Sequence, residues 1–322
     1  MRALLCRELG GALEIAEVPS PQPGEKQVRI AVRAAAANFP DVLMLEGKYQ
    51  FKPPMPFAPG CELAGEIEAV GPGAEGFRIG QRVLAVVQHG AFAEAALADV
   101  ARVVPIPDGV AFDAAAAFMF TYGTSYHALK DRGALAPGES LLVLGAGGGV
   151  GLAAVELGKR MGARVIAAAS SAAKLDACRE HGADETIDYS REDLRERIKA
   201  LTDGRGVDVV YDPVGGPFTE PAFRSLAWRG RLLVVGFANG EIPKLPLNLP
   251  LLKGASVVGV FWGDFTRREP AANRANMAEL AAWLAEGKLR PHIGARYPLA
   301  EGAKAIADVR ERRAVGKVLV LP

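Results

Sequence analysis

The feature that most constrains the fold is a run of glycines placed directly after a short apolar segment. Residues Ser140–Leu144 are apolar after the first, and the next seven residues read Gly-Ala-Gly-Gly-Gly-Val-Gly. A pattern typical of a helix then continues to Met161. A strand, a glycine-rich turn and a helix in this order are characteristic of a doubly wound parallel sheet. The segment therefore predicts an α/β domain with a ligand at this turn.

The turn departs slightly from the usual dinucleotide-binding pattern, because Ala146 occupies the first glycine position and gives A-x-G-x-x-G. Gly148 would let the backbone approach a pyrophosphate, and Gly151 would allow close packing of helix on strand. Free N–H groups at the start of the helix attract the same anion. The alternative is a flexible turn with no ligand, but the strand and helix around it favour a dinucleotide. The residues expected to line it are Gly145, Ala146, Gly147, Gly148, Gly149, Val150 and Gly151.

From about residue 123 the sequence alternates between apolar strands and amphipathic helices. Continuous Val, Leu and Ile strands separated by such helices predict a parallel sheet covered on both faces. The expected strands are Ser140–Leu144, Arg164–Ala169, Thr186–Tyr189, Val207–Asp212, Arg231–Phe237 and Ser256–Phe261. The expected helices run from the turn to Met161 and over Ala172–His181, Glu192–Leu201 and Phe218–Trp228.

The first 120 residues have a different pattern, rich in glycine and proline with short alternating runs. Val28, Ile30 and Val32 alternate with other residues, as in a half-buried strand. Similar runs bounded by turn residues predict a small antiparallel barrel or sandwich. After the last apolar strand the pattern changes again, and we expect the final segments to fold against this barrel. The other runs are Gly65–Val70, Arg82–Val87 and Ala101–Ile106, and the final segments are the helices Asn273–Leu289 and Ala303–Arg312 and the strands Arg296–Leu299 and Lys317–Leu321.

The residues after the second strand of the parallel sheet indicate which dinucleotide binds. A site that prefers NAD has an acidic residue about 20 residues after the glycine turn. Here Ser170 and Ser171 occupy that place, Lys174 follows, and no acid appears before Asp176. Two hydroxyls and a cation suit a 2′-phosphate, and a carboxylate would repel it. Alternatively, Ser171 caps a helix and Lys174 is solvated, which is compatible with the same role. The sequence predicts NADPH.

Composition excludes several classes of partner. The formal net charge is +1, which gives no reason to expect nucleic acid or an anionic membrane as partner. No apolar run is long enough to span a bilayer, and charges appear by Arg2 and Arg7, too early for a secretory signal, so we expect a cytoplasmic protein. Cys6, Cys61 and Cys178 are widely separated, so we expect no disulfide framework and no metal.

The chain resembles, over essentially its whole length, the zinc-independent quinone oxidoreductases of the medium-chain dehydrogenase/reductase superfamily. The stretch Arg224–Arg231 and the stretch Gly259–Gly263 are most similar to the quinone oxidoreductase-like protein 2 branch. The motifs that carry the wider resemblance are Asn38–Asp41, Phe57–Gly65, Gly80–Val83, Thr121–Leu129, the glycine turn and Gly316–Leu319.

This resemblance implies a GroES-like β-barrel domain built from residues 1–122 and 264–322, and a Rossmann NADPH-binding domain over 123–263. It implies an active site in the cleft between the two domains. The zinc-binding relatives have Cys near Asn38 and His at Cys61, so no zinc site is expected. Many members form dimers through the edge strand of the Rossmann sheet, which would be Ser256–Phe261 here, although a buried strand would look the same.

The resemblance also assigns site residues. It places Asn38, Asp41 and Tyr49 near the nicotinamide, where Asn38 would hydrogen-bond the acceptor carbonyl and Tyr49 would relay a proton. The alternative for Asn38 and Asp41 is the capped start of a helix. Leu43 stands where some quinone reductases have a second tyrosine, which leaves the acceptor open. The cofactor residues implied are Thr124 at the nicotinamide, Lys174, Tyr189 and Arg312 at the 2′-phosphate, Gly236 and Phe237 at the carboxamide, and Phe261 and Gly263.

We therefore expect hydride transfer from NADPH to a quinone or similar conjugated carbonyl. An enoyl-thioester or alkenal reductase is an alternative, and basic residues that hold a CoA phosphate would favour it. An NADPH-binding structural or regulatory protein with little turnover is a second alternative, which tight binding without consumption of an acceptor would support.

Overall fold

The protein is described here by a computed structural model of residues 1–322, which fold into two compact units. Unit 1 comprises residues 1–120 and 281–322, and unit 2 comprises residues 121–280. The second boundary therefore falls within helix α10 (Pro270–Ala285), whereas the sequence suggested a boundary at residue 264. None of the helices is long and apolar enough to cross a membrane.

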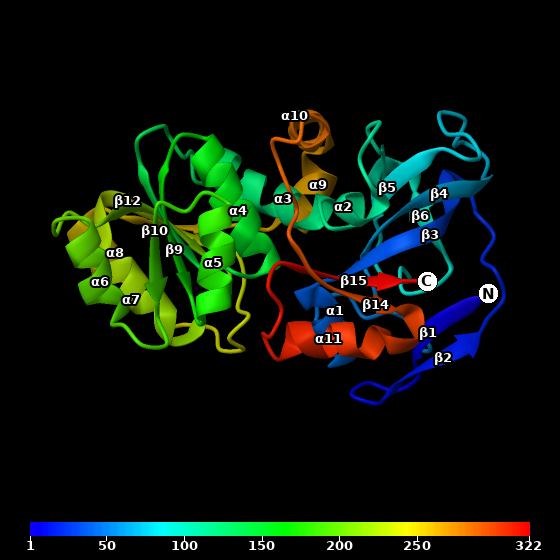
Figure 1. The fold of residues 1–322 in the computed structure, drawn as a ribbon, viewed down its shortest axis with the longest axis horizontal. Coiled ribbons are helices and arrows are strands. Elements are labelled where there is room, and N and C mark those ends of the chain that lie inside the picture. The colour runs from blue at the N-terminus through cyan, green and yellow to red at the C-terminus, as the bar shows by residue number, and fades with distance from the viewer. The chain divides into compact units, whose positions relative to one another are not determined.

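Unit 1 is built on a seven-stranded sheet in which both ends of the chain take part (Figure 1). The long strand β3 (Gln27–Ala37) lies at its centre, and strand β15 (Lys317–Leu321) pairs antiparallel with it. Alternate residues of β3 are fully buried, among them Val28 and Ile30, as the alternating pattern predicted. The GroES-like part of the predicted fold is confirmed. The other strands are β4 (Glu62–Val70), β5 (Arg82–Val86), β6 (Ala95–Asp99), β7 (Val103–Pro105) and β14 (Ile293–Pro298).

Three short helices and a hairpin complete unit 1. The hairpin of β1 (Arg2–Cys6) and β2 (Leu13–Glu17) was not anticipated, because its second strand has few buried side chains. Of the predicted strand Ala101–Ile106 only β7 is extended, and residues 100–102 form a 3-10 turn. The helices are α1 (Phe39–Leu45), α2 (Phe112–Ala116) and α11 (Gly302–Arg310).

Unit 2 contains a six-stranded, fully parallel sheet in the order β10-β9-β8-β11-β12-β13, which confirms the doubly wound domain. Helices α4 and α5 lie on one side of it and α6, α7 and α8 on the other (Figure 1). Leu141–Leu144 are fully buried, as a strand covered on both faces requires. The strands are β8 (Ser140–Leu144), β9 (Arg164–Ala169), β10 (Glu185–Asp188), β11 (Val207–Asp212), β12 (Leu226–Val234) and β13 (Ser256–Gly259), and the helices are α3 (Met119–Tyr126), α4 (Gly149–Arg160), α5 (Ala172–Glu180), α6 (Leu194–Leu201), α7 (Thr219–Arg224), α8 (Asn248–Lys253) and α9 (Trp262–Arg268).

Several elements of unit 2 differ from the sequence prediction. Helix α7 ends at Arg224, and Trp228 lies in strand β12 instead of the predicted helix. Strand β12 pairs with β11 on one side and with β13 on the other, so sheet pairing overrides local helix propensity here. The Lys253 ammonium group also donates to the Leu226 carbonyl at 2.6 Å. Helices α8 and α9 were not predicted.

Candidate functional site

The glycine turn makes the tight connection that the sequence predicted. Gly145 has φ of +57°, which favours glycine, and the Ala146 N–H donates to the Ala168 carbonyl of the neighbouring strand at 3.0 Å. A Cβ on Gly151 would lie 2.3 Å from the Gly145 carbonyl oxygen. A Cβ on Gly148, the N-cap of α4, would meet nothing closer than 3.5 Å. The helix therefore packs closely at Gly151, whereas a Cβ at Gly148 would make only ordinary contact.

Lys174 packs against this turn. A Cβ on Gly147 would lie 2.4 Å from the Lys174 Cβ. Lys174 therefore packs so closely against Gly147 that no side chain fits at that position. Ser171 occupies the N-cap position of α5, but its hydroxyl makes no capping hydrogen bond. Ser170 is exposed, and Tyr189 follows β10 and packs on the Phe218 ring with centroids 4.6 Å apart. The structure thus brings the predicted cation to the turn, and no acidic residue follows β9 before Asp176.

Thr124 lies in the middle of helix α3, which begins at Met119. The following residue, Ser125, was not predicted as a site residue. Its hydroxyl donates to the Val150 carbonyl of the glycine turn at 2.9 Å and hydrogen-bonds with the buried Tyr211 hydroxyl at 2.9 Å. Ser125 therefore ties α3 to the turn, and its only sequence signal was its place beside Thr124.

The other predicted cofactor residues of unit 2 lie after its last strands. Gly236 and Phe237 follow β12, and the Phe237 ring lies 2.9 Å from the position of a Cβ on Gly215. Phe261 is 59% exposed, and Gly263 lies in the first turn of α9. These residues lie at the carboxyl end of a parallel sheet, where ligands of open α/β sheets bind.

Unit 1 contains a buried polar cluster around Asn38. The Lys317 ammonium group donates to Asn38 Oδ1 at 2.6 Å and to Glu62 Oε2 at 2.9 Å. The Asn38 amide nitrogen donates to Glu62 Oε2 and to the Ala36 carbonyl, both at 3.2 Å. The Phe120 N–H donates to Glu62 Oε1 at 2.7 Å, so both carboxylate oxygens are engaged.

The sheet register explains why these side chains meet. Val318 of β15 pairs with Ala37 of β3, which places Lys317 opposite Asn38. Glu62 of β4 pairs with Ala36, two residues before Asn38 and therefore on the same face. The sequence analysis noted the segments that contain Glu62 and Lys317 but gave these two residues no role. The available signal was a charged residue directly before an apolar strand segment in each case.

Asp41 supports the start of helix α1. Its carboxylate accepts from the Asn38 N–H at 2.8 Å and from the Gly60 N–H at 3.1 Å. The capping interpretation of Asp41 therefore has geometric support, whereas the Asn38 side chain bonds elsewhere. Burial raises the pKa of Asp41 to about 7, although the two backbone donors, Lys317 and the Cys61 thiol act in the opposite direction.

Tyr49 lies half-buried near this cluster. Burial raises its pKa, and the neighbouring Cys61 and Asp41 raise it further. Burial also raises the pKa of Cys61 well above its usual value, so Cys61 is a protonated thiol. The structure therefore groups all three predicted catalytic residues, with Glu62 and Lys317 added.

Arg312 belongs to unit 1 and follows α11 with φ of +58°. The arginines on either side of it contact carboxylates of the same unit: Arg310 lies 3.6 Å from Glu46, and Arg313 binds Asp308 and Glu311. These ion pairs hold Arg310 and Arg313 within unit 1. The assignment of Arg312 to a 2′-phosphate stays a prediction.

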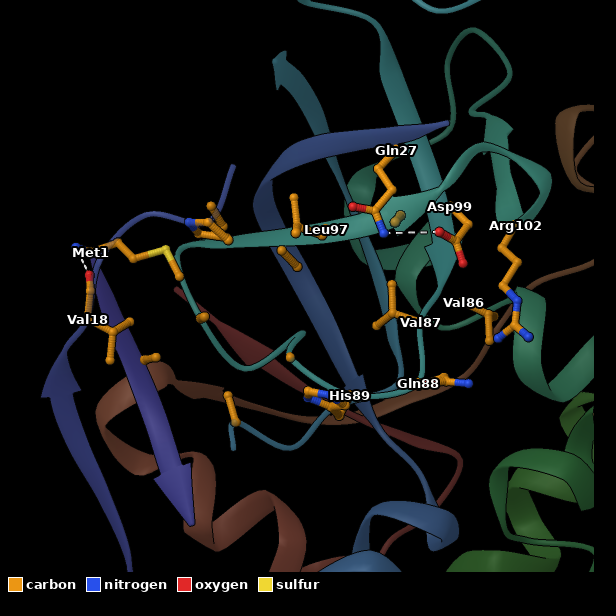
Figure 2. Close-up of a pocket in the computed structure, with 18 residues that line it drawn as sticks. Met1, Val18, Gln27, Val86, Val87, Gln88, His89, Leu97, Asp99 and Arg102 are labelled. Carbon is orange, nitrogen blue, oxygen red and sulfur yellow. Dashed lines mark hydrogen bonds between the residues drawn. The ribbon is translucent and has the colours of Figure 1, made fainter. Parts of the chain in front are cut away.

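A cavity of about 360 Å³ in unit 1 contains none of the predicted site residues (Figure 2). Its wall is made by β6, the hairpin β1–β2 and the loop after β5. The Gln27 amide donates to Asp99 at 3.1 Å at one end, and His89, whose Nδ1 is buried without a hydrogen-bond partner, lies at the other. No group of three or more His, Cys, Asp or Glu side chains has the arrangement of a metal site.

Comparison with known proteins matches the chain over both units. Two family models match, "Alcohol dehydrogenase GroES-like domain" over residues 24–108 and "Zinc-binding dehydrogenase" over residues 149–284. The quinone oxidoreductase-like protein 2 homolog of Nematostella vectensis is 39% identical, with 99% of this chain and 88% of that protein covered. The quinone oxidoreductase of Pseudomonas aeruginosa is 36% identical, with 96% and 95% covered. The quinone oxidoreductase of Thermus thermophilus, solved alone and with NADPH, matches at 35% identity over 100% of both chains with a TM-score of 0.87.

Proposed function

Because the chain belongs to the quinone oxidoreductase family of the medium-chain dehydrogenase/reductase superfamily, we propose that it passes a hydride from NADPH to a quinone or similar conjugated carbonyl. The observation that carries the choice of cofactor is the contact between Lys174 and the glycine turn, together with the lack of an acid at the end of β9. The solved relative from Thermus thermophilus was studied with the same cofactor.

The residues of unit 2 fit NADPH. The lack of a close contact at Gly148 and the N-terminus of the 12-residue helix α4 suit the pyrophosphate. Lys174, with Ser170 and Ser171 beside it, supplies charge and hydroxyls for a 2′-phosphate, and Tyr189 and Arg312 would complete that subsite. Thr124, Gly236, Phe237, Phe261 and Gly263 would contact the nicotinamide end.

The residues of unit 1 suit the acceptor. When bound, NADPH supplies a hydride, which adds two electrons and one hydrogen to the acceptor. The acceptor oxygen then gains negative charge, which donors in the Asn38 cluster would stabilise. The Tyr49 hydroxyl, which forms no hydrogen bond within the protein, or a water molecule would then deliver the proton that completes the hydroquinone.

The test is NADPH oxidation with a compact ortho-quinone, compared with crotonyl-CoA and acryloyl-CoA under matched conditions, each with an enzyme-free blank. We expect turnover of the quinone with NADPH and much slower turnover with NADH. Turnover of the thioesters alone would replace the proposal with an enoyl-thioester reductase. NADPH binding without turnover of any acceptor would instead support an NADPH-binding structural or regulatory protein.

We propose in addition that the chain is a homodimer through the edge strand β13. Several large apolar side chains on or near this edge are exposed, which is unusual for a free surface. They include Val257 at 49%, Trp228 at 70% and Leu251 at 79%. Light scattering should give twice the chain mass. Val257→Arg should give the monomer, and Ile79→Arg, at an apolar side chain of unit 1 that is 70% exposed, should not. A monomeric wild-type chain would contradict the proposal.

A further inference from the structure

The orientation of the Asn38 amide is fixed by its neighbours. Lysine has donors and no acceptor, so the Asn38 atom 2.6 Å from the Lys317 ammonium group must be the oxygen. The other amide atom, the nitrogen, faces two groups that only accept, the Glu62 carboxylate and the Ala36 carbonyl. Both amide hydrogens of Asn38 are therefore used within the protein, and none is left for a bound acceptor.

Lys317 has a donor to spare. An ammonium group has three N–H donors, and the hydrogen bonds of Lys317 engage only two groups, Asn38 Oδ1 and Glu62 Oε2. The side chain is 5% exposed, so bulk water competes little for the remaining hydrogen. A buried donor without an acceptor is costly, and a ligand oxygen would remove that cost.

The ammonium group is also held rigidly. Lys317 is the first residue of β15, opposite the end of β3, and Glu62 comes from the adjacent strand β4. The Glu62 carboxylate, which is fully buried, is itself anchored by the Phe120 N–H. Donors that are held in place before the reaction stabilise a developing charge without reorganisation.

From this arrangement we infer that Lys317, and not Asn38, donates the hydrogen bond to the acceptor carbonyl oxygen, and that Asn38 and Glu62 are positioning residues. The inference rests on the proposed function. The hydride adds to the acceptor and its carbonyl π electrons move to the oxygen, where the Lys317 ammonium group stabilises the anion. A proton from Tyr49 or water then neutralises the anion, so one hydride and one proton convert the quinone into the hydroquinone.

The test compares two variants over a series of quinones of decreasing electron affinity. The double variant Lys317→Met/Glu62→Gln removes the donor and the buried negative charge together. Asn38→Ala removes the proposed positioning residue and leaves Lys317 paired with Glu62. Lys304→Met/Glu301→Gln makes the same chemical change at an exposed ion pair of unit 1 and is the matched control.

If Lys317 is the donor, the double variant should lose about 100-fold in kcat/KM for a weak acceptor and less for a strong one. The dependence of rate on electron affinity should thus become steeper. A merely structural role would lower all rates by one factor. Asn38→Ala leaves Lys317 paired with Glu62, so it should steepen the dependence much less than the double variant. NADPH binding and the melting temperature, measured on each variant, verify that it is folded.

An unchanged dependence in the folded double variant would overturn the inference. A loss of about 100-fold for the weak acceptor in Asn38→Ala would overturn it as well, because Asn38 would then be the donor, and this result decides the question even if the double variant does not fold. A wild-type chain without quinone turnover would instead contradict the proposed function itself.

Discussion

The two units of this protein build their polar sites in different ways. In unit 2 the candidate site is local, since the seven consecutive residues of the glycine turn lead from β8 into the first turn of α4. In unit 1 the site is assembled from three strands, and Lys317 meets Asn38 across 279 residues of sequence. A local site tolerates changes elsewhere in its sheet, whereas an assembled one depends on the register of each strand.

The largest effect should come from the buried ion pair of unit 1. Lys317→Met leaves the Glu62 carboxylate buried without a charged partner, so we expect a loss of about 3–5 kcal/mol in the free energy of unfolding. Chemical denaturation measures this loss. Lys304→Met, at an exposed ion pair, should change stability by at most about 0.5 kcal/mol. Equal losses in the free energy of unfolding for the two variants would show that the buried ion pair matters no more to stability than an exposed one.

A second change tests the cation of unit 2. Lys174→Met should weaken NADPH binding by about 1.5–3 kcal/mol, roughly 10- to 100-fold, because one charge-assisted hydrogen bond to the 2′-phosphate is lost. NADH, which lacks that phosphate, should bind the variant and the wild type alike. Cofactor fluorescence titration measures both affinities. An equal loss for both cofactors would show that Lys174 acts through packing against Gly147.

A pair of glycine variants separates packing from ligand binding within the turn. Gly151→Ala places a Cβ 2.3 Å from the Gly145 carbonyl oxygen and should cost about 1–3 kcal/mol in stability. Gly148→Ala meets no protein atom closer than 3.5 Å, so its stability should stay within about 0.5 kcal/mol of wild type while NADPH affinity falls. Thermal melts with and without NADPH measure both. If Gly148→Ala binds NADPH with wild-type affinity, the pyrophosphate does not bind at this turn.

The last effect concerns pH and is the smallest when taken per pH unit. Because burial raises the pKa of Asp41 to about 7, the folded state retains a proton that the unfolded chain releases near pH 4. The Asp41 contribution to stability is therefore full below pH 4 and falls as pH rises toward 7, by up to about 1.4 kcal/mol per pH unit. Unfolding at several pH values should show this decline in wild type and not in Asp41→Asn. An identical decline in both would assign it to other groups.

The same contrast explains what could be read from the sequence. The parallel strands and the glycine turn follow from local patterns, and β8, β9, β11 and β15 have the predicted bounds. Glu62 and Lys317 carry no local signal of a site, because only the antiparallel pairing of β15, β3 and β4 brings them to one face. The Asn38 amide illustrates the limit further: its donors were predicted to be available, and long-range partners occupy them.

The pairing of β15 with β3 also determines the order in which the protein can mature during synthesis. Residues 121–280 leave the ribosome before residues 317–321, so unit 2 can fold while the central strand of unit 1 still lacks one neighbour. The glycine turn can thus be completed early, but the ammonium group of Lys317 reaches Asn38 only once β15 has been translated. The buried polar cluster of unit 1 is then the last part of the candidate site to form, and a chain that ends before β15 lacks it.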